Sequence, residues 1–488
     1  MFELREGLHF YIVGIGGSGM SAIARLLLGR GFTVSGSDRA VTALTAVLQS
    51  EGATVYAGHD GDNIADADVL VISSAIPADN AEIVAARAMG LPVLKRADLL
   101  GHLMDGCTGI AIAGTHGKTT TTGMITQIFM QAGLDPTVIV GSDLPILGGN
   151  GRFGKGTHFI IEADEYDNMF LGLRPTIAVI TNIEHDHPDI FPTDEAYTAA
   201  FLRFANLLPA DGTLILCGDD AGAMRLRAQF DRPDVHVIVY GMDEDEHSRR
   251  LSLSKAEAED AALTSTGSAA AELMGLNGRS NPIGGTDFIV QQGDDLVGLA
   301  RLRVPGKHNA QNALAAIAAG LTAGVCFDDM RTALAQFGGM ARRFQIISTA
   351  NRVAIIDDYA HHPTEIQATL AAAREQYPAR RIWAVWQPHT FSRTKLLLNE
   401  FAASFADADR VVVLDVYRSR ETEADGVGAD TAVAAMTHPH AVHVGDRRAA
   451  ADYIFERILP DDVILTLGAG DGNMVGKWIA ADLEERQK

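Results

Sequence analysis

A seven-residue segment in the first third of the chain has the composition of a phosphate-binding loop. It follows an apolar run at 110–113, precedes a stretch of helical length, and consists of Gly114, Thr115, His116, Gly117, Lys118, Thr119 and Thr120. In such a loop the backbone N–H groups surround phosphate oxygens, the lysine reaches the terminal phosphates and a hydroxyl can bind Mg²⁺. Ile112 stands where the longer form of the motif has its first glycine, so this is the shorter G-x-x-G-K-T form. The segment predicts a site for ATP with Mg²⁺, for which Mn²⁺ can substitute.

Acidic and imidazole side chains follow the next two apolar runs. Glu162, Asp164 and Glu165 come directly after the run 159–161, and a second polar group ends at His187 after the run 177–180. Parallel strands of one sheet present such residues at the same edge, where ligands bind. Because Mg²⁺ prefers carboxylate oxygens, Glu162 is the first choice of metal ligand beside Thr119, and Glu165 is the reserve. His187 is expected at a second metal position or next to the phosphate. A solvated acidic loop is the alternative interpretation.

A second glycine-rich loop lies near the N-terminus, between an apolar run at 9–13 and a helical stretch that ends near Leu28. It contains Gly14, Gly16, Gly17, Ser18 and Gly19 in a G-x-G-x-x-G pattern. Without side chains, the backbone can approach a diphosphate at the helix N-terminus, and Asp38, at the end of the next strand, can hold a ribose hydroxyl. Taken alone, the loop favours an NAD-dependent dehydrogenase. The alternative interpretation is a tight strand-helix turn that binds no ligand. If the loop does bind a ligand, its pattern indicates a diphosphate but does not say which nucleotide carries it.

Further polar groups follow apolar runs in the last third of the chain. Asp358, His361 and His362 follow one run, and His389 and Arg393 follow another. These side chains could recognise a carboxylate or an amine, the arginine through its bidentate guanidinium. Asn309 and Asn312 open an alanine-rich helix, where they could bind adenine, but their spacing favours an N-cap role. The turn 468–472 predicts another strand-helix junction, to which we assign no catalytic role.

The whole chain predicts an α/β protein of three domains, each with a mainly parallel sheet and flanking helices. Fully apolar runs recur along all 488 residues and helical stretches follow most of them, as in doubly wound sheets. A Rossmann-like domain is expected at 1–107, a P-loop domain at 108–340 and a second Rossmann-like domain at 341–488. Between residues 243 and 295 the sequence has little periodicity, so we expect irregular or weakly paired structure there.

Composition excludes several classes of protein. With 40 basic and 62 acidic side chains the formal charge is −22, which argues against a nucleic-acid partner. No apolar run has the length of a membrane span, and the N-terminus lacks the pattern of a secretory signal. Three cysteines far apart in the sequence fit neither a disulfide framework nor a zinc site. A cytoplasmic protein without a membrane partner is expected, whereas the oligomeric state is open.

Ordered motifs along nearly the whole chain resemble those of the Mur ligase family, and most closely those of its alanine-adding members. They are VGIGGSGMSAIA at 13–24, SGSD at 35–38, SSAIP at 73–77, AGTHGKTTTT at 113–122, EADE at 162–165 and TNIEHDH at 181–187, followed by GKHNAQNA, ARRF, DDYAHHPTEI and QPHTFSRT. The resemblance implies an ATP-dependent ligase that joins L-alanine to the lactyl carboxylate of UDP-N-acetylmuramate through an acyl phosphate, in peptidoglycan precursor synthesis.

The resemblance also implies where the substrates bind. The N-terminal domain would bind the UDP-sugar through the first glycine loop, with Asp38, His59, Ser73 and Ser74 as neighbours of the nucleotide. The reasoning from the phosphate loop adds Lys118, Glu162 and His187 as catalytic residues and Thr119, Glu162 and His187 as metal ligands. Asn309, Asn312 and Arg343 become expected ATP contacts. The resemblance implies that Tyr359, His389 and Arg393 lie near the lactyl carboxylate and the alanine, and His361 is a further substrate contact expected from its place in the polar motif.

Three other functions stay open at this point. The motifs EADEYD and HPDIFPT are similar to those of a relative that attaches recycled L-alanyl-γ-D-glutamyl-meso-diaminopimelate to UDP-N-acetylmuramate, although QPHTFSRTK favours the alanine-adding type. The dehydrogenase hypothesis accounts for the first glycine loop but leaves 114–120 unexplained. A nucleotide-switched binding protein without product formation is a third hypothesis.

Overall fold

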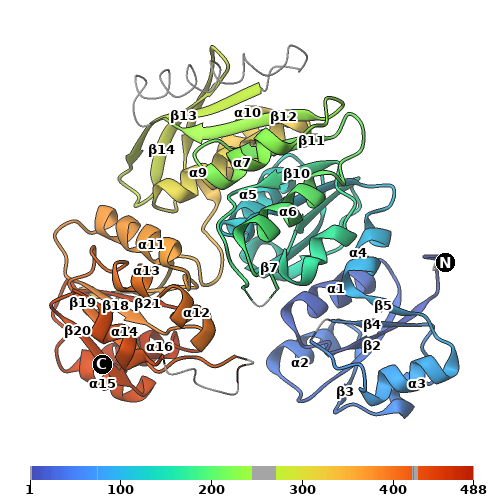
Figure 1. Cartoon of the computed structure of the whole chain (residues 1–488), viewed down its shortest axis with the longest axis horizontal. Coiled ribbons are helices and arrows are strands. Elements are labelled where there is room, and N and C mark those ends of the chain that lie inside the picture. The colour runs from blue at the N-terminus through green and yellow to red at the C-terminus, as the bar shows by residue number, and fades with distance from the viewer. Residues whose placement is uncertain are drawn as a thin grey trace. The chain divides into compact units, whose positions relative to one another are not determined.

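The computed structural model describes residues 3–73, 75–188, 190–243, 271–419, 421 and 427–486. The strands of these residues form a five-stranded, a ten-stranded and a six-stranded sheet, which follow one another along the chain (Figure 1). The chain divides into two compact units. The first contains Met1–Gly278, Phe288–Ala300 and Gln311–Phe337, and the second contains Arg279–Asp287, Arg301–Ala310 and Gly338–Lys488. The predicted α/β class is confirmed.

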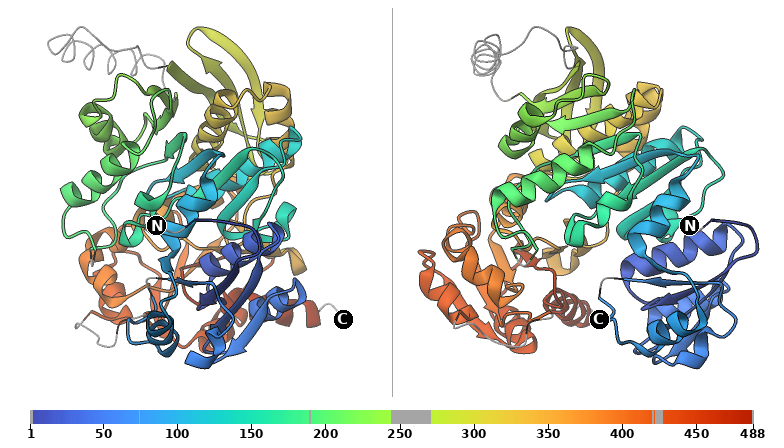
Figure 2. Two further views of the ribbon diagram at one scale, coloured as in Figure 1. Left: turned by 90° about the vertical axis from the view of Figure 1, so that its right-hand side faces the viewer. Right: turned by 45° about the vertical axis from the view of Figure 1, so that its right-hand side comes forward.

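The N-terminal sheet is parallel throughout and has the order β3-β2-β1-β4-β5. Its strands are β1 (His9–Val13), β2 (Thr33–Asp38), β3 (Thr54–Ala57), β4 (Val69–Ile72) and β5 (Val93–Lys95). Helices pack on both faces of this sheet (Figure 2). One face is covered by α1 (Ser18–Gly29), α2 (Ala43–Ser50) and α4 (Arg96–Met104), and the opposite face by α3 (Ala81–Met89) and the 3-10 segment η1 (Gly61–Ile64). Because β1 is central, the loop that follows it lies between the ends of β2 and β4.

The ten-stranded sheet places the phosphate-type loop at its centre. Its order is β15-β14-β13-β12-β11-β10-β6-β9-β7-β8. Strand β6 (Thr108–Ala113) pairs in parallel with β9 (His158–Glu162) and β10 (Ile177–Ile180). The three strands therefore end at one edge. The other members of this half are β7 (Thr137–Leu144), β8 (Gly149–Arg152), β11 (Thr213–Cys217) and β12 (His236–Met242), with α5 (Lys118–Gln131), α6 (Asp194–Ala205), α7 (Ala221–Gln229) and the 3-10 segments η2 (Pro145–Leu147) and η3 (Tyr166–Gly172).

One apolar core joins the first two sheets. It includes Leu99 of α4, Phe159 of β9, Phe170 of η3 and Phe201 of α6, all of them almost fully buried. Arg96, the first residue of α4, also pairs with Asp164 after β9, with Nη2 3.2 Å from Oδ2. The two glycine loops are therefore built on elements that share a core.

The expectation of irregular structure between residues 243 and 295 was wrong for its second half. Residues 271–301 form β13 (Ala271–Ser280), β14 (Thr286–Gln292) and β15 (Asp295–Arg301) at one end of the ten-stranded sheet. Strands β13 and β15 have mixed burial patterns because they lie near the end of the sheet, so their sequences lack a strong apolar period, whereas β14 buries most of its residues. The first half of the segment lies outside the described residues. Helices α9 (Lys307–Thr322) and α10 (Phe327–Gln336) follow.

The C-terminal sheet has the order β16-β17-β21-β18-β19-β20, and only β16 runs antiparallel to its neighbour. Its strands are β16 (Gln345–Ser348), β17 (Ala354–Asp358), β18 (Ile382–Trp386), β19 (Arg410–Leu414), β20 (Ala441–Gly445) and β21 (Val463–Leu467). Helices α11 (Pro363–Gln376), α13 (Leu398–Ala402) and α14 (Ala429–Ala435) pack on one face, and α15 (Arg447–Phe455) and α16 (Met474–Glu485) pack on the other. The polar motifs after 357 and 387 both begin at the carboxyl ends of strands. Within the described ranges no helix combines the length and apolarity needed to cross a membrane.

Candidate active site

The loop between β6 and α5 has the backbone of a phosphate cradle. Gly114 and Gly117 have φ angles of 132° and 81°, values that L side chains rarely adopt. A Cβ on Gly117 would lie 2.5 Å from Oδ1 of Asn312, so the position also lacks room for a side chain. Gly117 caps α5 without a side-chain hydrogen bond, which leaves the first N–H groups of the helix available to an anion. Thr120 is buried in the first turn of α5.

Lys118 is held over its own loop. Its Nζ donates hydrogen bonds to the carbonyl oxygens of Gly114 and Thr115 and pairs with Oε2 of Glu165 at 2.9 Å. Burial by itself lowers the pKa of Lys118, but the nearby carboxylates of Glu165, Asp164 and Glu162 more than offset this, and the net pKa is raised. The lysine is therefore a largely buried cation, with 14% of its side chain exposed, at the position where the terminal phosphates of a nucleotide are expected.

Thr119 and Glu162, the first two candidate metal ligands, lie next to each other. The hydroxyl of Thr119 donates to Oε1 of Glu162 at 3.0 Å, and Oε2 of Glu162 accepts the backbone N–H of Gly141 at 2.7 Å. A hydroxyl and a carboxylate oxygen beside a phosphate cradle are the donors that Mg²⁺ prefers. The residues present therefore fit this ion.

Glu165 occupies a different position from its reserve role as a metal ligand. It is almost fully buried, and its Oε1 lies 3.5 Å from Nε2 of His187 and accepts from the hydroxyl of Tyr197 at 3.4 Å. Burial raises the pKa of Glu165, but Lys118 and His187 outweigh that effect, so the net pKa is lowered. His187 itself has a φ of 55° and packs its ring edge-on against Tyr166. Glu165 thus connects two of the three predicted catalytic residues.

Thr115 and His116 connect the loop to the strand-end segment after β10. The Thr115 hydroxyl donates to the carbonyl oxygen of Glu184 at 2.9 Å and lies 3.1 Å from the hydroxyl of Tyr197. His116 places Nε2 2.9 Å from Oε2 of Glu184 and donates its backbone N–H to Asn182. Burial raises the pKa of Tyr197 well above its usual range, so the phenol is neutral. No motif in the sequence points to Tyr197, because its partners are 82 and 32 residues away.

The predicted adenine contacts do not act as N-caps. Asn309 and Asn312 lie inside α9, which begins at Lys307. Asn309 donates its amide to the carbonyl oxygen of Pro305 at 2.7 Å, whereas Asn312 packs on Gly117 of the phosphate loop. Arg343 places its guanidinium 5.2 Å from the ring centroid of Tyr359 and 3.5 Å from Glu365.

The N-terminal glycine loop is organised by Asp38. Gly14 has a φ of 76°, and Gly16 donates its N–H to Oδ2 of Asp38 at 2.8 Å. A Cβ on Gly16 would lie 2.8 Å from the same oxygen, so the glycine permits this close approach. Gly17 caps α1 without a side-chain hydrogen bond and Ser18 begins the helix. A Cβ on Gly19 would lie 2.2 Å from Nη1 of Arg96, which places that arginine directly against the loop.

His59 is held by a buried carboxylate that the sequence analysis missed. Its Nδ1 lies 3.0 Å from Oε2 of Glu82 and 2.9 Å from the hydroxyl of Ser37. Glu82 also accepts from Tyr11, although the side chain comes from a helix whose sequence shows no motif. Ser73 follows β4 and accepts the N–H of Ala75. Ser74 lies outside the described residues.

Four aromatic rings form a row in the second unit. Tyr359 contacts His361 at a centroid distance of 5.3 Å, His361 contacts His389 at 5.7 Å, and His389 stacks on Tyr417 at 5.7 Å. Arg393 lies beside the row, with Nη1 3.2 Å from Nδ1 of His389. The structure therefore brings the four predicted substrate contacts of this unit together.

The half-buried His308 and the buried Asp358, both near Arg343 and Glu365, have opposite pKa shifts. Burial lowers the pKa of His308 to about 4, and the positive charge of Arg343 contributes in the same direction. Burial raises the pKa of Asp358 to about 6, although Arg343 and the N–H groups of Phe344 and Ala360 oppose it. His308 is therefore neutral at neutral pH.

The substitution His308→Gln is expected to make the protein less sensitive to mild acid. Below the ordinary pKa of 6.5 the unfolded chain takes up a proton that the folded chain accepts only at about 4. The stability that the neutral imidazole contributes is present above that ordinary pKa and is lost as the pH falls toward the folded value, by roughly 3 kcal/mol at most. The raised pKa of Asp358 makes the folded protein more stable as the pH falls, which is the opposite of the effect of His308. Because wild type and variant both contain Asp358, its effect cancels when the two proteins are compared. Melting curves at about pH 7 and about pH 5 should give a Tm difference between variant and wild type that shrinks or reverses in acid. An unchanged difference would contradict the prediction.

Three family models match consecutive parts of the chain. The model described as Mur ligase family, catalytic domain, matches residues 9–107. The Mur ligase middle domain matches residues 112–320, and the model described as Mur ligase, glutamate ligase domain, matches residues 342–470. Together these matches include both glycine loops and both motifs of the second unit.

Individual relatives are similar over nearly the full length. A curated protein of Roseiflexus sp. named UDP-N-acetylmuramate--L-alanine ligase is 44% identical over 486 residues, which is 98% of this chain and 100% of the relative. The crystal structure of UDP-N-acetylmuramate-alanine ligase MurC from Thermotoga maritima has a TM-score of 0.77 at 27% identity and covers 99% of this chain and 100% of its own. A murein peptide ligase from Psychrobacter arcticus shares the fold, with a TM-score of 0.70 at 24% identity over 98% of this chain and 99% of its own.

Proposed function

Because the chain belongs to the Mur ligase family, we propose that it joins L-alanine to the lactyl carboxylate of UDP-N-acetylmuramate while ATP is cleaved to ADP and phosphate. The product would be a precursor of peptidoglycan, and the reaction would take place in the cytoplasm. The observation that carries the proposal is the convergence of Lys118, Thr119 and Glu162 on one phosphate cradle in a chain whose full-length relatives carry that enzyme name. Family membership accounts for both glycine loops, whereas the dehydrogenase hypothesis accounts for only one.

The proposed chemistry begins with activation of the carboxylate. An oxygen of the lactyl carboxylate attacks the γ-phosphorus of ATP, the bond to the β-phosphate oxygen breaks, and ADP and an acyl phosphate result. Lys118 and the loop N–H groups stabilise the charge on the transferred phosphoryl group, which is a matter of position and electrostatics. Thr119 and Glu162 would hold Mg²⁺, with His187 at a second position, and the ion supplies further neutralisation of phosphate charge.

The second step would consume the acyl phosphate. The neutral amine of L-alanine attacks the acyl carbon, and the tetrahedral intermediate expels phosphate as the amide forms and the amine loses a proton. His361, His389 and Arg393 would orient the amino acid, since a guanidinium can pair with its carboxylate. Glu165 would keep Lys118 and His187 in position throughout. On the UDP-sugar side, the glycine loop 14–19 would bind the diphosphate, and Asp38, His59, Ser73 and Ser74 would lie near the nucleoside.

Phosphate release tests the proposed function. Purified protein with Mg²⁺-ATP is assayed with and without UDP-N-acetylmuramate, and with either L-alanine or L-alanyl-γ-D-glutamyl-meso-diaminopimelate as acceptor. The proposal predicts release that requires both the sugar nucleotide and L-alanine. Release only with the tripeptide would assign the chain to the recycling reaction. Release of phosphate without any sugar nucleotide would favour a nucleotide-switched binding protein.

A further inference from the structure

Tyr417 ends the row of rings in the second unit, yet no motif in the sequence pointed to it. The other three rings, Tyr359, His361 and His389, are expected contacts of the substrates. Tyr417 stacks on His389 with an interplanar angle of 18°, and its side chain is 37% exposed. A partly exposed ring at the end of a row of expected ligand contacts is in a position to touch the ligand as well.

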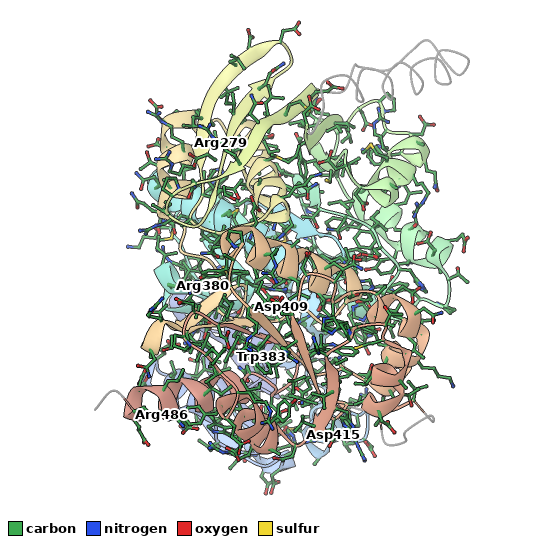
Figure 3. All side chains as sticks on the ribbon, turned by 90° about the vertical axis from the view of Figure 1, so that its left-hand side faces the viewer. Arg279, Arg380, Trp383, Asp409, Asp415 and Arg486 are labelled. Carbon is green, nitrogen blue, oxygen red and sulfur yellow. The ribbon has the colours of Figure 1, made fainter. Side chains whose placement is uncertain are left out.

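The backbone around Tyr417 is fixed to the acceptor motif. Its N–H donates to the carbonyl oxygen of Pro388 at 2.8 Å, and its own carbonyl oxygen accepts the N–H of Thr390 at 2.9 Å. These bonds form an isolated parallel bridge between His389 and Tyr417. Tyr417 belongs to the segment that follows β19. Asp409 directly precedes this strand and Asp415 directly follows it, and Figure 3 labels both residues. Tyr417 is therefore attached to the end of a strand and to the neighbouring motif.

The glycine turn after β21 leaves room for the ring of Tyr417. A Cβ on Gly470 would lie 2.7 Å from Cγ and 2.8 Å from Cδ2 of Tyr417. The same turn is held in place because Gly472 donates its N–H to Oε1 of Gln387 at 2.7 Å. One side of the ring thus meets His389 and another meets the backbone of Gly470. The ring is therefore in contact on two sides, with His389 and with the turn that contains Gly470.

We propose that Tyr417 is a specificity-determining residue of the acceptor site, whose ring forms a fixed wall against the side chain of the incoming amino acid. The inference rests on the proposed function and deepens it. A wall of this kind would make van der Waals contact with the methyl group of L-alanine and would crowd a branched side chain. The substrate class that fits is a small L-α-amino acid. Size selection of this type is worth about tenfold to two-hundredfold per methylene group.

The test compares acceptors in the phosphate-release assay. For the wild type, Tyr417→Phe and Tyr417→Ala, kcat and KM are measured with L-alanine and with L-valine. Tyr417→Ala is expected to reduce the preference for L-alanine by about tenfold or more, mainly through KM for the amino acids. KM for ATP should not change, and Tyr417→Phe, which keeps the wall, should retain the wild-type preference. Tyr453→Ala, which removes a partly exposed tyrosine of α15 in the same unit, is the matched control.

Two further results keep the inference separate from folding and from the proposed function. Gly470→Ala retains Tyr417 but adds a methyl group where the ring lies, so the ring must move and the preference for L-alanine over L-valine should change. Circular dichroism checks that each variant is folded. An unchanged preference in folded Tyr417→Ala and Gly470→Ala would overturn the inference. If the wild type responds only to the tripeptide, the proposed function fails, and the variants are assayed with tripeptides that begin with alanine or valine under the same criterion. No response to any acceptor would overturn both.

Discussion

Replacing Lys118 with methionine is expected to lower kcat for phosphate release by about a thousandfold. The ammonium group is the buried cation of the phosphate loop, and methionine has a similar length but no charge to place on the transferred phosphoryl group. Michaelis constants for the amino acid should change little, because Lys118 belongs to the nucleotide loop. Single-turnover measurements with Mg²⁺-ATP and UDP-N-acetylmuramate separate the phosphoryl transfer from product release and would locate the defect.

The same substitution also removes the partner of Glu165, so stability must be measured beside activity. A buried carboxylate that loses its cation destabilises a protein by roughly 3 kcal/mol. The double variant Lys118→Met with Glu165→Gln removes both charges and should recover most of the lost Tm without recovering activity. If the double variant regained activity together with stability, Lys118 would serve the fold rather than the reaction.

The substitution Glu162→Gln is expected to lower kcat by about a hundredfold and to raise the Mg²⁺ concentration needed for half-maximal rate. Glutamine is isosteric, so one oxygen can still accept the N–H of Gly141. What disappears is the negative charge beside the hydroxyl of Thr119. Titrating Mg²⁺, and separately Mn²⁺, at a fixed ATP concentration measures the change.

Glu165→Gln provides the matched control, because it removes a carboxylate only three positions away. Glu165 contacts Lys118, His187 and Tyr197 rather than Thr119. Its loss should lower Tm and kcat while the Mg²⁺ concentration for half-maximal rate stays close to that of the wild type. A larger shift of the Mg²⁺ requirement in Glu165→Gln than in Glu162→Gln would reverse the two assignments.

The sequence was most informative where local rules suffice. A strand, a glycine loop and a helix in that order predict an anion site, and 14–19 and 114–120 both have the expected backbone. The carboxyl ends of parallel strands share an edge, which is why Thr119 and Glu162 could be expected to meet although they are 43 residues apart. Their roles in binding and catalysis remain predictions for the experiments above.

The features that could not be predicted from the sequence depend on contacts between distant segments. Spacing alone does not say which carboxylate of a loop turns inward, and the burial of Glu165 depends on Lys118, His187 and Tyr197 from three other segments. Glu82 and Tyr417 likewise gain their positions from contacts with residues far away in the sequence. Strands β13 and β15 were missed because strands near a sheet edge need no continuous apolar run. Such contacts are properties of the folded chain rather than of any short window.

The strand order of the C-terminal sheet has a consequence for the order of folding during synthesis. Strand β21 lies between β17 and β18, although it is formed by Val463–Leu467, more than seventy residues after β18. The N-terminal sheet, by contrast, uses only strands that end by Lys95 and can be completed as soon as that segment leaves the ribosome. The six-stranded sheet has a gap at its centre until β21 has been translated. The histidine motifs at the ends of β17 and β18 therefore acquire their structure after the phosphate loop, and a ribosome that stalls late would release a chain with a formed phosphate loop and an incomplete C-terminal sheet.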